Sequence, residues 1–207
     1  MPKFVTQHGT IMNFNYTSKK SGNSIGTIDL PSCSCGPTTI TMITYALGNI
    51  SALDTYFNND LPTNESDVAR QHAGLMAVYM YEYGLNGNPN HKEGSCGGLV
   101  DYSSSAYKSF WDSLSLEVVN NFSSGSAADR ILNDLKQGYL VVYNIKGSTG
   151  TNLGDSSSGH FGLIYGYDAK TNNFLINNPA MDQGGLTVSY EGVNSYVKNT
   201  SFSVKAK

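Results

Sequence analysis

The spacing of apolar residues changes along this chain, from a helical period in the first two thirds to short alternating runs in the last third. The helical period predicts helices over residues 35–47, 66–83, 104–114 and 126–137. Three of these segments are followed directly by a glycine, a residue that commonly ends a helix. Residues 1–34 lack this period, and we expect extended segments and loops there.

After Gly138 the pattern predicts strands. Short runs of β-branched and aromatic residues, separated by turn-forming residues, cover 139–145, 161–167, 174–176, 186–190 and 202–204. Helices followed by strands are typical of an α+β domain with an antiparallel sheet. Ser- and Gly-rich stretches at 122–126 and 147–159 are interpreted as surface loops, because neither is long enough to separate two cores. We therefore expect one domain over residues 1–207.

The composition and the lack of certain motifs argue against nucleic-acid binding, membrane insertion and several enzyme classes. Charged residues make up 14% of the chain and the net charge is −3, so there is no basic surface to attract nucleic acid. No stretch approaches the roughly 20 apolar residues of a membrane helix, and the N-terminus carries no apolar run typical of a signal peptide. We expect a protein made in the cytoplasm, without membrane insertion. The Ser-rich loops contain no GxSxG elbow of the kind found in serine hydrolases, and no common phosphate-binding loop is visible.

Cys35 stands at the junction between a loop and the helix predicted from residue 35. The unpaired N–H groups and the positive end of the dipole at a helix start stabilise a thiolate, which is the nucleophilic form of cysteine. Gly36 leaves space beside the sulfur. The same position also suits a small apolar residue that merely packs at a helix start. From local sequence alone, both interpretations stay open.

His160 opens an apolar and aromatic run, which is an unusual place for an imidazole unless it faces a site. A base at a strand start that faces a nucleophile at a helix start would form a Cys–His pair. The strand over 174–176 is followed by two asparagines, and side chains on adjacent strands lie about 5 Å apart. Alternation directs Asn177 to the opposite face, so we favour Asn178 as the acceptor of the imidazole N–H. A buried structural histidine is the alternative for His160.

The other cysteines allow a competing hypothesis. Cys33 lies too close to Cys35 in the chain for an ordinary disulfide. A zinc site could be formed by Cys33, Cys35, Cys96 and His91. We disfavour it because the spacing contains no clean CxxC pair and because zinc would occupy the proposed nucleophile. Metals and other cofactors are therefore not expected, and Cys96 is expected in a loop that borders a substrate cleft.

Taken together, these motifs resemble the C39-like branch of the papain-fold cysteine peptidases. Cys-Gly-Pro-Thr-Thr precedes an apolar helix, Gly-His-Phe opens a strand that ends in Tyr-Gly-Tyr-Asp, and Asn-Asn-Pro-Ala follows. The resemblance covers nearly the whole chain. It implies a papain-like α+β fold in which a central helix bearing Cys35 packs on a C-terminal antiparallel sheet. Cys35 would be the nucleophile and His160 the general base and acid.

The family pattern differs from this sequence at one position and extends to the N-terminal residues. Asn178 stands where the family usually has Asp; papain-type peptidases use Asn in this role, so activity is still expected. Residues 4–7 look like the family's N-terminal strand, which ends in a glutamine of the oxyanion hole. Gln7 would then stabilise the oxyanion together with the Cys35 N–H. Next to it, His8 is a candidate for the cleft.

The remaining candidates complete the site prediction. Gly36, Gly159, His8 and Cys96 are expected to line the substrate cleft. His8, His72 and His91 are interpreted as surface or loop residues.

The substrate is inferred from the type of protein that the chain resembles. Low charge with many Asn, Tyr and Gly residues suggests a protein of a Gram-positive bacterium or its phage. We expect a peptidoglycan endopeptidase, either an endolysin or a virion-associated hydrolase, which reaches the cell wall by lysis or in the virion. The alternatives are a protease acting on a polypeptide or leader peptide, and an inactive papain-fold module that binds peptide or builds the virion.

Overall fold

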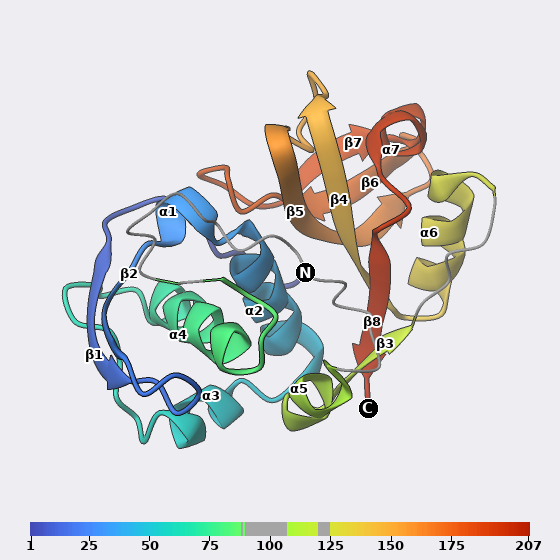
Figure 1. Ribbon diagram of the computed structural model, residues 1–207. Coiled ribbons are helices and arrows are strands. Elements are labelled where there is room, and N and C mark those ends of the chain that lie inside the picture. Colours follow the sequence, from blue (N-terminus) through green and yellow to red (C-terminus); the bar gives the residue numbers. More distant parts are fainter. Residues whose placement is uncertain (88, 90–106, 120–124) are drawn as a thin grey trace.

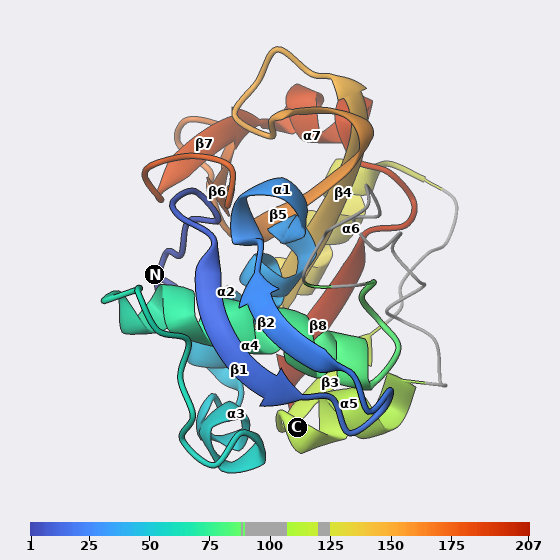
Figure 2. The ribbon, with the colours of Figure 1, turned by 60° about the vertical axis from the view of Figure 1, so that its left-hand side comes forward.

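The computed structural model describes residues 1–87, 89, 107–119 and 125–207. Its layers run from a two-stranded ribbon through helices to a sheet and further helices (Figure 1). The ribbon consists of β1 (Met12–Thr17) and β2 (Ser24–Ile28), which pair antiparallel. Next to it lie α4 (Val68–Glu82) and α2 (Cys35–Leu47), and Figure 2 shows the ribbon crossing in front of these helices.

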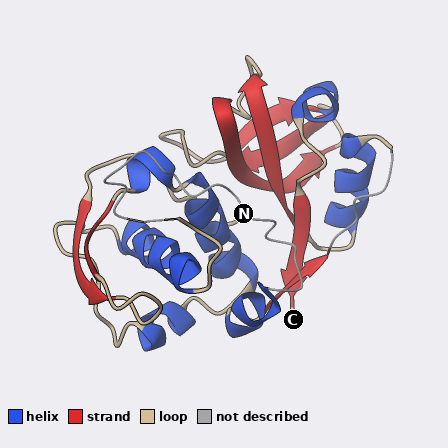
Figure 3. Cartoon of the chain, viewed as in Figure 1, coloured by secondary structure: helices blue, strands red, loops and turns tan. Residues whose placement is uncertain are grey.

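A six-stranded antiparallel sheet forms the C-terminal half. Its strand order is β3-β8-β4-β5-β6-β7. The bounds are Leu116–Val119, Leu140–Ser148, Asp155–Asp168, Asn173–Asn177, Leu186–Ser189 and Phe202–Ala206 for β3 to β8. One face receives α2, and the other is covered by α6 (Ala127–Lys136) and α7 (Tyr190–Tyr196). Figure 3 shows most helices of the N-terminal half on one side of the molecule and the strands of the sheet on the other, with α2 between them.

This arrangement confirms the expected fold class, since the Cys35 helix packs on a C-terminal antiparallel sheet. The position of α2 between the helical half and the sheet explains its composition. Residues 36–44 are all buried, although four of them are threonines. Three of these hydroxyls, from Thr39, Thr41 and Thr44, donate to the carbonyl four residues earlier. Such bonds satisfy a polar side chain inside a core without a partner from another element.

Several short elements were not predicted. They are α1 (Leu30–Cys33), α3 (Ser51–Tyr56), α7 and β3. Each is too short to show a hydrophobic period in the sequence. The helix expected over 104–114 is seen as α5, Lys108–Ser113, and the first residues of that prediction lie outside the described part of the chain.

Three sequence-based interpretations were wrong. The stretch 147–159 is mostly a hairpin, because β4 and β5 keep pairing up to Ser148 and Asp155, so only 149–154 is a loop. Residues 4–7 form no strand, and the Gln7 N–H instead donates to the carbonyl of Pro179. His72 is buried, with hydrogen bonds to the Tyr45 hydroxyl at 2.5 Å and to Asp54 at 3.0 Å.

Candidate active site

Cys35 is the first residue of α2, and the sequence around it leaves the helix start without a side-chain cap. Ser34 is the N-cap residue, but its hydroxyl makes no capping hydrogen bond. Pro37, in the first turn, has no N–H to donate. The N–H groups of Cys35 and Gly36 instead favour the charged form of the Cys35 sulfur. The helix start therefore supplies donors at the position of the candidate nucleophile.

The sheet supplies a third donor. Because α2 packs on β5, the backbone N–H of Phe161 also reaches the Cys35 sulfur, which places the sulfur beside the main chain of the residue after His160. Burial of the thiol raises its pKa, and the three N–H donors only partly oppose this effect, so the net pKa lies above the ordinary value of 9.0. The residue as a whole stays partly exposed.

His160 lies at the start of the buried part of β5, and Asn178 follows β6. The ring Nε2 of His160 is 2.7 Å from Oδ1 of Asn178, and both side chains are buried. Antiparallel pairing of β5 with β6 brings these residues together, 18 positions apart in the chain. Burial lowers the pKa of the imidazole, and the hydrogen bond that the ring donates to Asn178 partly opposes this shift.

The surroundings of Asn178 determine which ring nitrogen carries the proton. Its Nδ2 donates to the carbonyl of Asn152 at 2.9 Å, and its Oδ1 accepts the Ala180 N–H at 2.9 Å. The carboxamide is therefore oriented with Oδ1 toward the imidazole, which requires a hydrogen on Nε2 of His160. Nδ1 of the neutral ring then holds a lone pair and makes no hydrogen bond to the described residues. The site thus contains an imidazole in a defined tautomer, with a lone pair on Nδ1.

A loop between β4 and β5 covers this pair, and sequence analysis missed its role. Gly154 has φ of +95°, and a Cβ on it would lie 3.0 Å from Nδ2 of Asn178 and 3.3 Å from Cδ2 of His160. The loop therefore approaches the pair as closely as a glycine allows. From the sequence, only a Ser- and Gly-rich loop could be predicted here. The group of residue 152 that contacts Asn178 is a main-chain carbonyl, which every residue type possesses.

Gln7 is joined to the same region through the main chain. Its N–H donates to the carbonyl of Pro179, the residue after Asn178, at 2.8 Å. The Nε2 of the side chain donates to the carbonyl of Pro31 at 3.1 Å, and the buried Oε1 has no hydrogen-bond partner. One hydrogen of Nε2 is thus engaged and the second is left to donate.

Comparison with known families identifies the chain. The pattern of the Peptidase C39 like family matches residues 11–202. The chain belongs to the C39-like peptidase family. A solved structure described as a C39-like peptidase from Bacillus anthracis is similar over 99% of this chain and 96% of that chain, with a TM-score of 0.50 and 15% sequence identity. At that identity the similarity shows the fold alone. No curated protein matches the chain.

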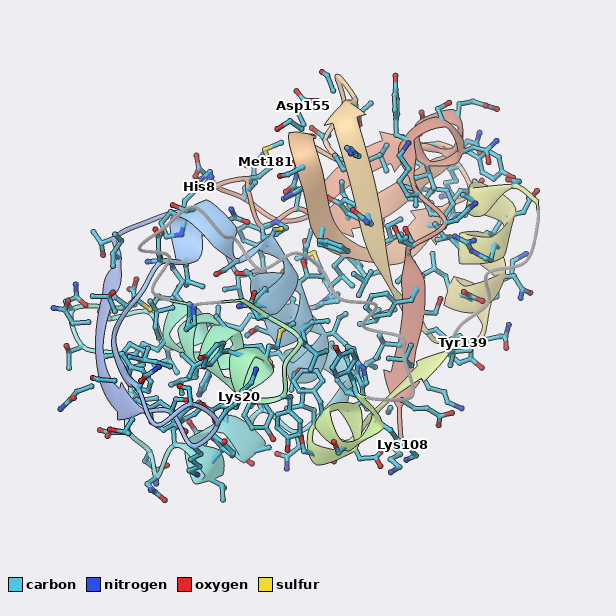
Figure 4. The ribbon with its side chains drawn as sticks, viewed as in Figure 1. His8, Lys20, Lys108, Tyr139, Asp155 and Met181 are labelled. Carbon is cyan, nitrogen blue, oxygen red and sulfur yellow. The ribbon has the colours of Figure 1, made fainter. Side chains whose placement is uncertain are left out.

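Membership in this family makes the protein a cysteine peptidase with a papain-like fold and a peptide as its substrate. The other cleft candidates of this C39-like peptidase lie in different environments. Gly36 is buried in the first turn of α2, and Gly159 is partly exposed just before His160. His8 is exposed and pairs with Asp182 at 2.9 Å, on the loop that also carries Met181 (Figure 4). Cys96 lies outside the described residues.

The described part of the C39-like peptidase contains no cluster of three or more His, Cys, Asp or Glu side chains that could hold a metal ion. Two members of the zinc set considered above, His91 and Cys96, lie outside that part. None of its described helices combines the length and the apolar character needed to cross a lipid bilayer.

Proposed function

We propose that this C39-like peptidase hydrolyses peptide bonds with Cys35 as nucleophile, His160 as general base and acid, and Asn178 as the residue that orients the imidazole. The observation that supports this assignment is the 2.7 Å hydrogen bond between His160 Nε2 and Asn178 Oδ1, which leaves Nδ1 as a free base. The sulfur of Cys35 lies beside the same stretch of β5.

The reaction begins with a neutral thiol and a neutral imidazole, because burial raises the pKa of Cys35 and lowers the pKa of His160. When substrate binds, the Cys35 proton passes to Nδ1 of His160 and the sulfur bonds to the carbonyl carbon. Contacts of this kind commonly tighten only in the substrate complex. The imidazolium is held by Asn178 through its other nitrogen.

The tetrahedral intermediate carries its negative charge on the former carbonyl oxygen. The Cys35 N–H and the second hydrogen of Gln7 Nε2 donate to this oxygen. His160 then returns its proton to the leaving amine as the C–N bond breaks, which gives a thioester at Cys35. Water, deprotonated by Nδ1, hydrolyses the thioester and restores the thiol and the neutral imidazole.

For the substrate we propose the peptide cross-links of bacterial peptidoglycan, with the enzyme acting at the cell wall after lysis or from a virion. The support is compositional: charged residues are few, and the chain is rich in Asn, Tyr and Gly. A polypeptide or leader peptide is the second candidate.

The test compares the wild-type protein with Cys35→Ala on purified Gram-positive cell walls and on casein. We expect the wild type to clear the walls and release new amines, with products identified by mass spectrometry, and Cys35→Ala to do neither. Cleavage of casein without cleavage of walls would favour the polypeptide substrate. Equal clearing by both proteins would reject the cysteine mechanism.

A further inference from the structure

Three successive carbonyl groups of the loop over the His160–Asn178 pair accept hydrogen bonds from side chains. The carbonyl of Asn152 accepts from Asn178 Nδ2 at 2.9 Å. The next, of Leu153, accepts the hydroxyl of Tyr143 at 3.1 Å, and that of Gly154 accepts the hydroxyl of Thr149 at 2.8 Å. Each carbonyl thus has a donor of its own: Asn178 and Tyr143 lie outside the loop, and Thr149 stands at its start. The backbone of the loop is therefore held in one position relative to the pair.

The carbonyl of Asn152 can only accept a hydrogen bond, so the group opposite it must be a donor. The Nδ2 of a carboxamide at position 178 meets this requirement. A carboxylate would place a negatively charged oxygen about 2.9 Å from the carbonyl oxygen, with no proton between them. The buried carbonyl would then also lose its partner.

We propose that the loop from Thr149 to Asp155 selects a carboxamide over a carboxylate at position 178 and, by accepting from its Nδ2, turns its Oδ1 toward the ring and so holds His160 in the Nε2–H tautomer. The inference rests on the proposed role of His160 as the base. It gives a physical reason for Asn at a position where the resembling family usually has Asp.

Asp155 is a positioning residue: it holds the loop in place and does not contact the imidazole. Its Oδ1 accepts the Thr149 N–H at 2.6 Å, the Ser148 hydroxyl at 3.1 Å and the Gly150 N–H at 3.3 Å. These bonds tie the end of the loop to its beginning. Asp155 lies near the tip of the β4–β5 hairpin (Figure 4).

Asp168 offers a matched control. Asp155 is the first residue of β5 and Asp168 is the last, at the turn toward β6. The Asp168 carboxylate accepts the Lys170 N–H at 2.9 Å and the Thr171 hydroxyl at 2.8 Å. It therefore organises a turn in the same way, at the opposite end of the strand from Asp155. Asp168→Ala removes comparable hydrogen bonds without affecting the loop over the His160–Asn178 pair.

The first test is a double-mutant cycle measured as the rate of clearing of Gram-positive walls at pH 7. We expect Asn178→Asp to reduce the rate about 10- to 100-fold in the native loop. In an Asp155→Ala background the loop can move away from the new carboxylate, so we expect the same substitution to reduce the rate less than about threefold. Equal reductions in both backgrounds, or wild-type clearing by Asn178→Asp, would overturn the proposal.

The second test does not depend on activity or on the fold of the Asn178 variant. Imidazole ¹⁵N NMR of the otherwise wild-type protein should show His160 as a single Nε2–H tautomer. We expect Asp155→Ala to give a mixture of tautomers, while Asp155→Asn, whose Oδ1 keeps the three bonds, and Asp168→Ala stay like the wild type. An unchanged spectrum for Asp155→Ala would overturn the proposal. If wild type fails to clear walls, the proposed substrate is wrong, but this measurement still decides the role of the loop.

Discussion

Truncation of Asn178 to alanine should separate the stability that this side chain contributes from its role in orienting the imidazole. The side chain is fully buried and makes three hydrogen bonds. Asn178→Ala therefore leaves His160 Nε2, the Ala180 N–H and the Asn152 carbonyl without this partner. An unsatisfied buried group costs about 1–3 kcal/mol, so the three together would cost about 3–9 kcal/mol.

The lower end of this range applies, because Asn152 is exposed and Gly154 partly exposed, so water can reach the vacated space. We expect a loss of about 3 kcal/mol in the free energy of unfolding, measured by urea denaturation with unchanged slope. The imidazole also loses its fixed tautomer, so the rate of wall clearing should fall about 100-fold, a typical contribution of general acid–base catalysis.

Asn64→Ala is the control for this experiment. The Asn64 side chain accepts the Asn13 N–H at 2.8 Å and donates to the Ile11 carbonyl at 3.1 Å, in the helical half. These groups are exposed and the residue has φ of +59°, so we expect a loss of about 1–2 kcal/mol. Activity should stay at the wild-type level under conditions where both variants are folded. Wild-type activity in Asn178→Ala would refute the proposed role of Asn178. An equal loss of activity in Asn64→Ala would refute it as well.

Three further predictions concern other parts of the site. Burial raises the pKa of Cys35, so its alkylation by iodoacetamide, followed by mass spectrometry, should still accelerate as the pH rises past 9.0; a constant rate between pH 5 and 8 would instead indicate a resting ion pair. Gly154→Ala should lower activity at least about tenfold because its Cβ would press on the His160–Asn178 pair, whereas Gly138→Ala, at a similar φ of +81° but with open space around it, should not; equal effects would contradict the close approach. Gln7→Ala and Gln7→Glu should both lower kcat about 100-fold with little change in KM, and wild-type kcat in either would exclude an oxyanion role.

The parts of the fold that the sequence predicted are those with a repeating pattern. The helix from Cys35 and the helix seen as Val68–Glu82 both carry several turns of apolar residues, and each is mostly buried. The strands were predicted where β-branched and aromatic residues alternate. The hairpin tip was missed because its residues between Gly147 and Gly159, apart from Leu153, are polar or small, and backbone pairing extends the strands there.

In the candidate site, too, some features could be expected from the sequence and others could not. Cys35, His160 and Asn178 carry chemistry in their side chains and stand at element boundaries, so residue type and position made them candidates, and the family resemblance gave them their expected roles. The contribution of residue 152 is a carbonyl group that every residue possesses, and no residue type signals it. The burial of His72 was missed for a different reason: its partners Tyr45 and Asp54 come from two other helices, and their convergence is a property of the packing.

The choice of Asn at position 178 also bears on the charge of the resting site. A carboxylate beside the imidazole would stabilise the imidazolium and raise the pKa of His160, which favours a thiolate–imidazolium pair before substrate arrives. With a carboxamide, burial dominates both partners: the pKa of His160 is lowered and that of Cys35 is raised. The resting site therefore holds its proton on sulfur. In the proposed mechanism, charge separation occurs only when a carbonyl is bound beside the oxyanion donors, so the reactivity of Cys35 toward a peptide should exceed what its reactivity toward a small alkylating agent would suggest.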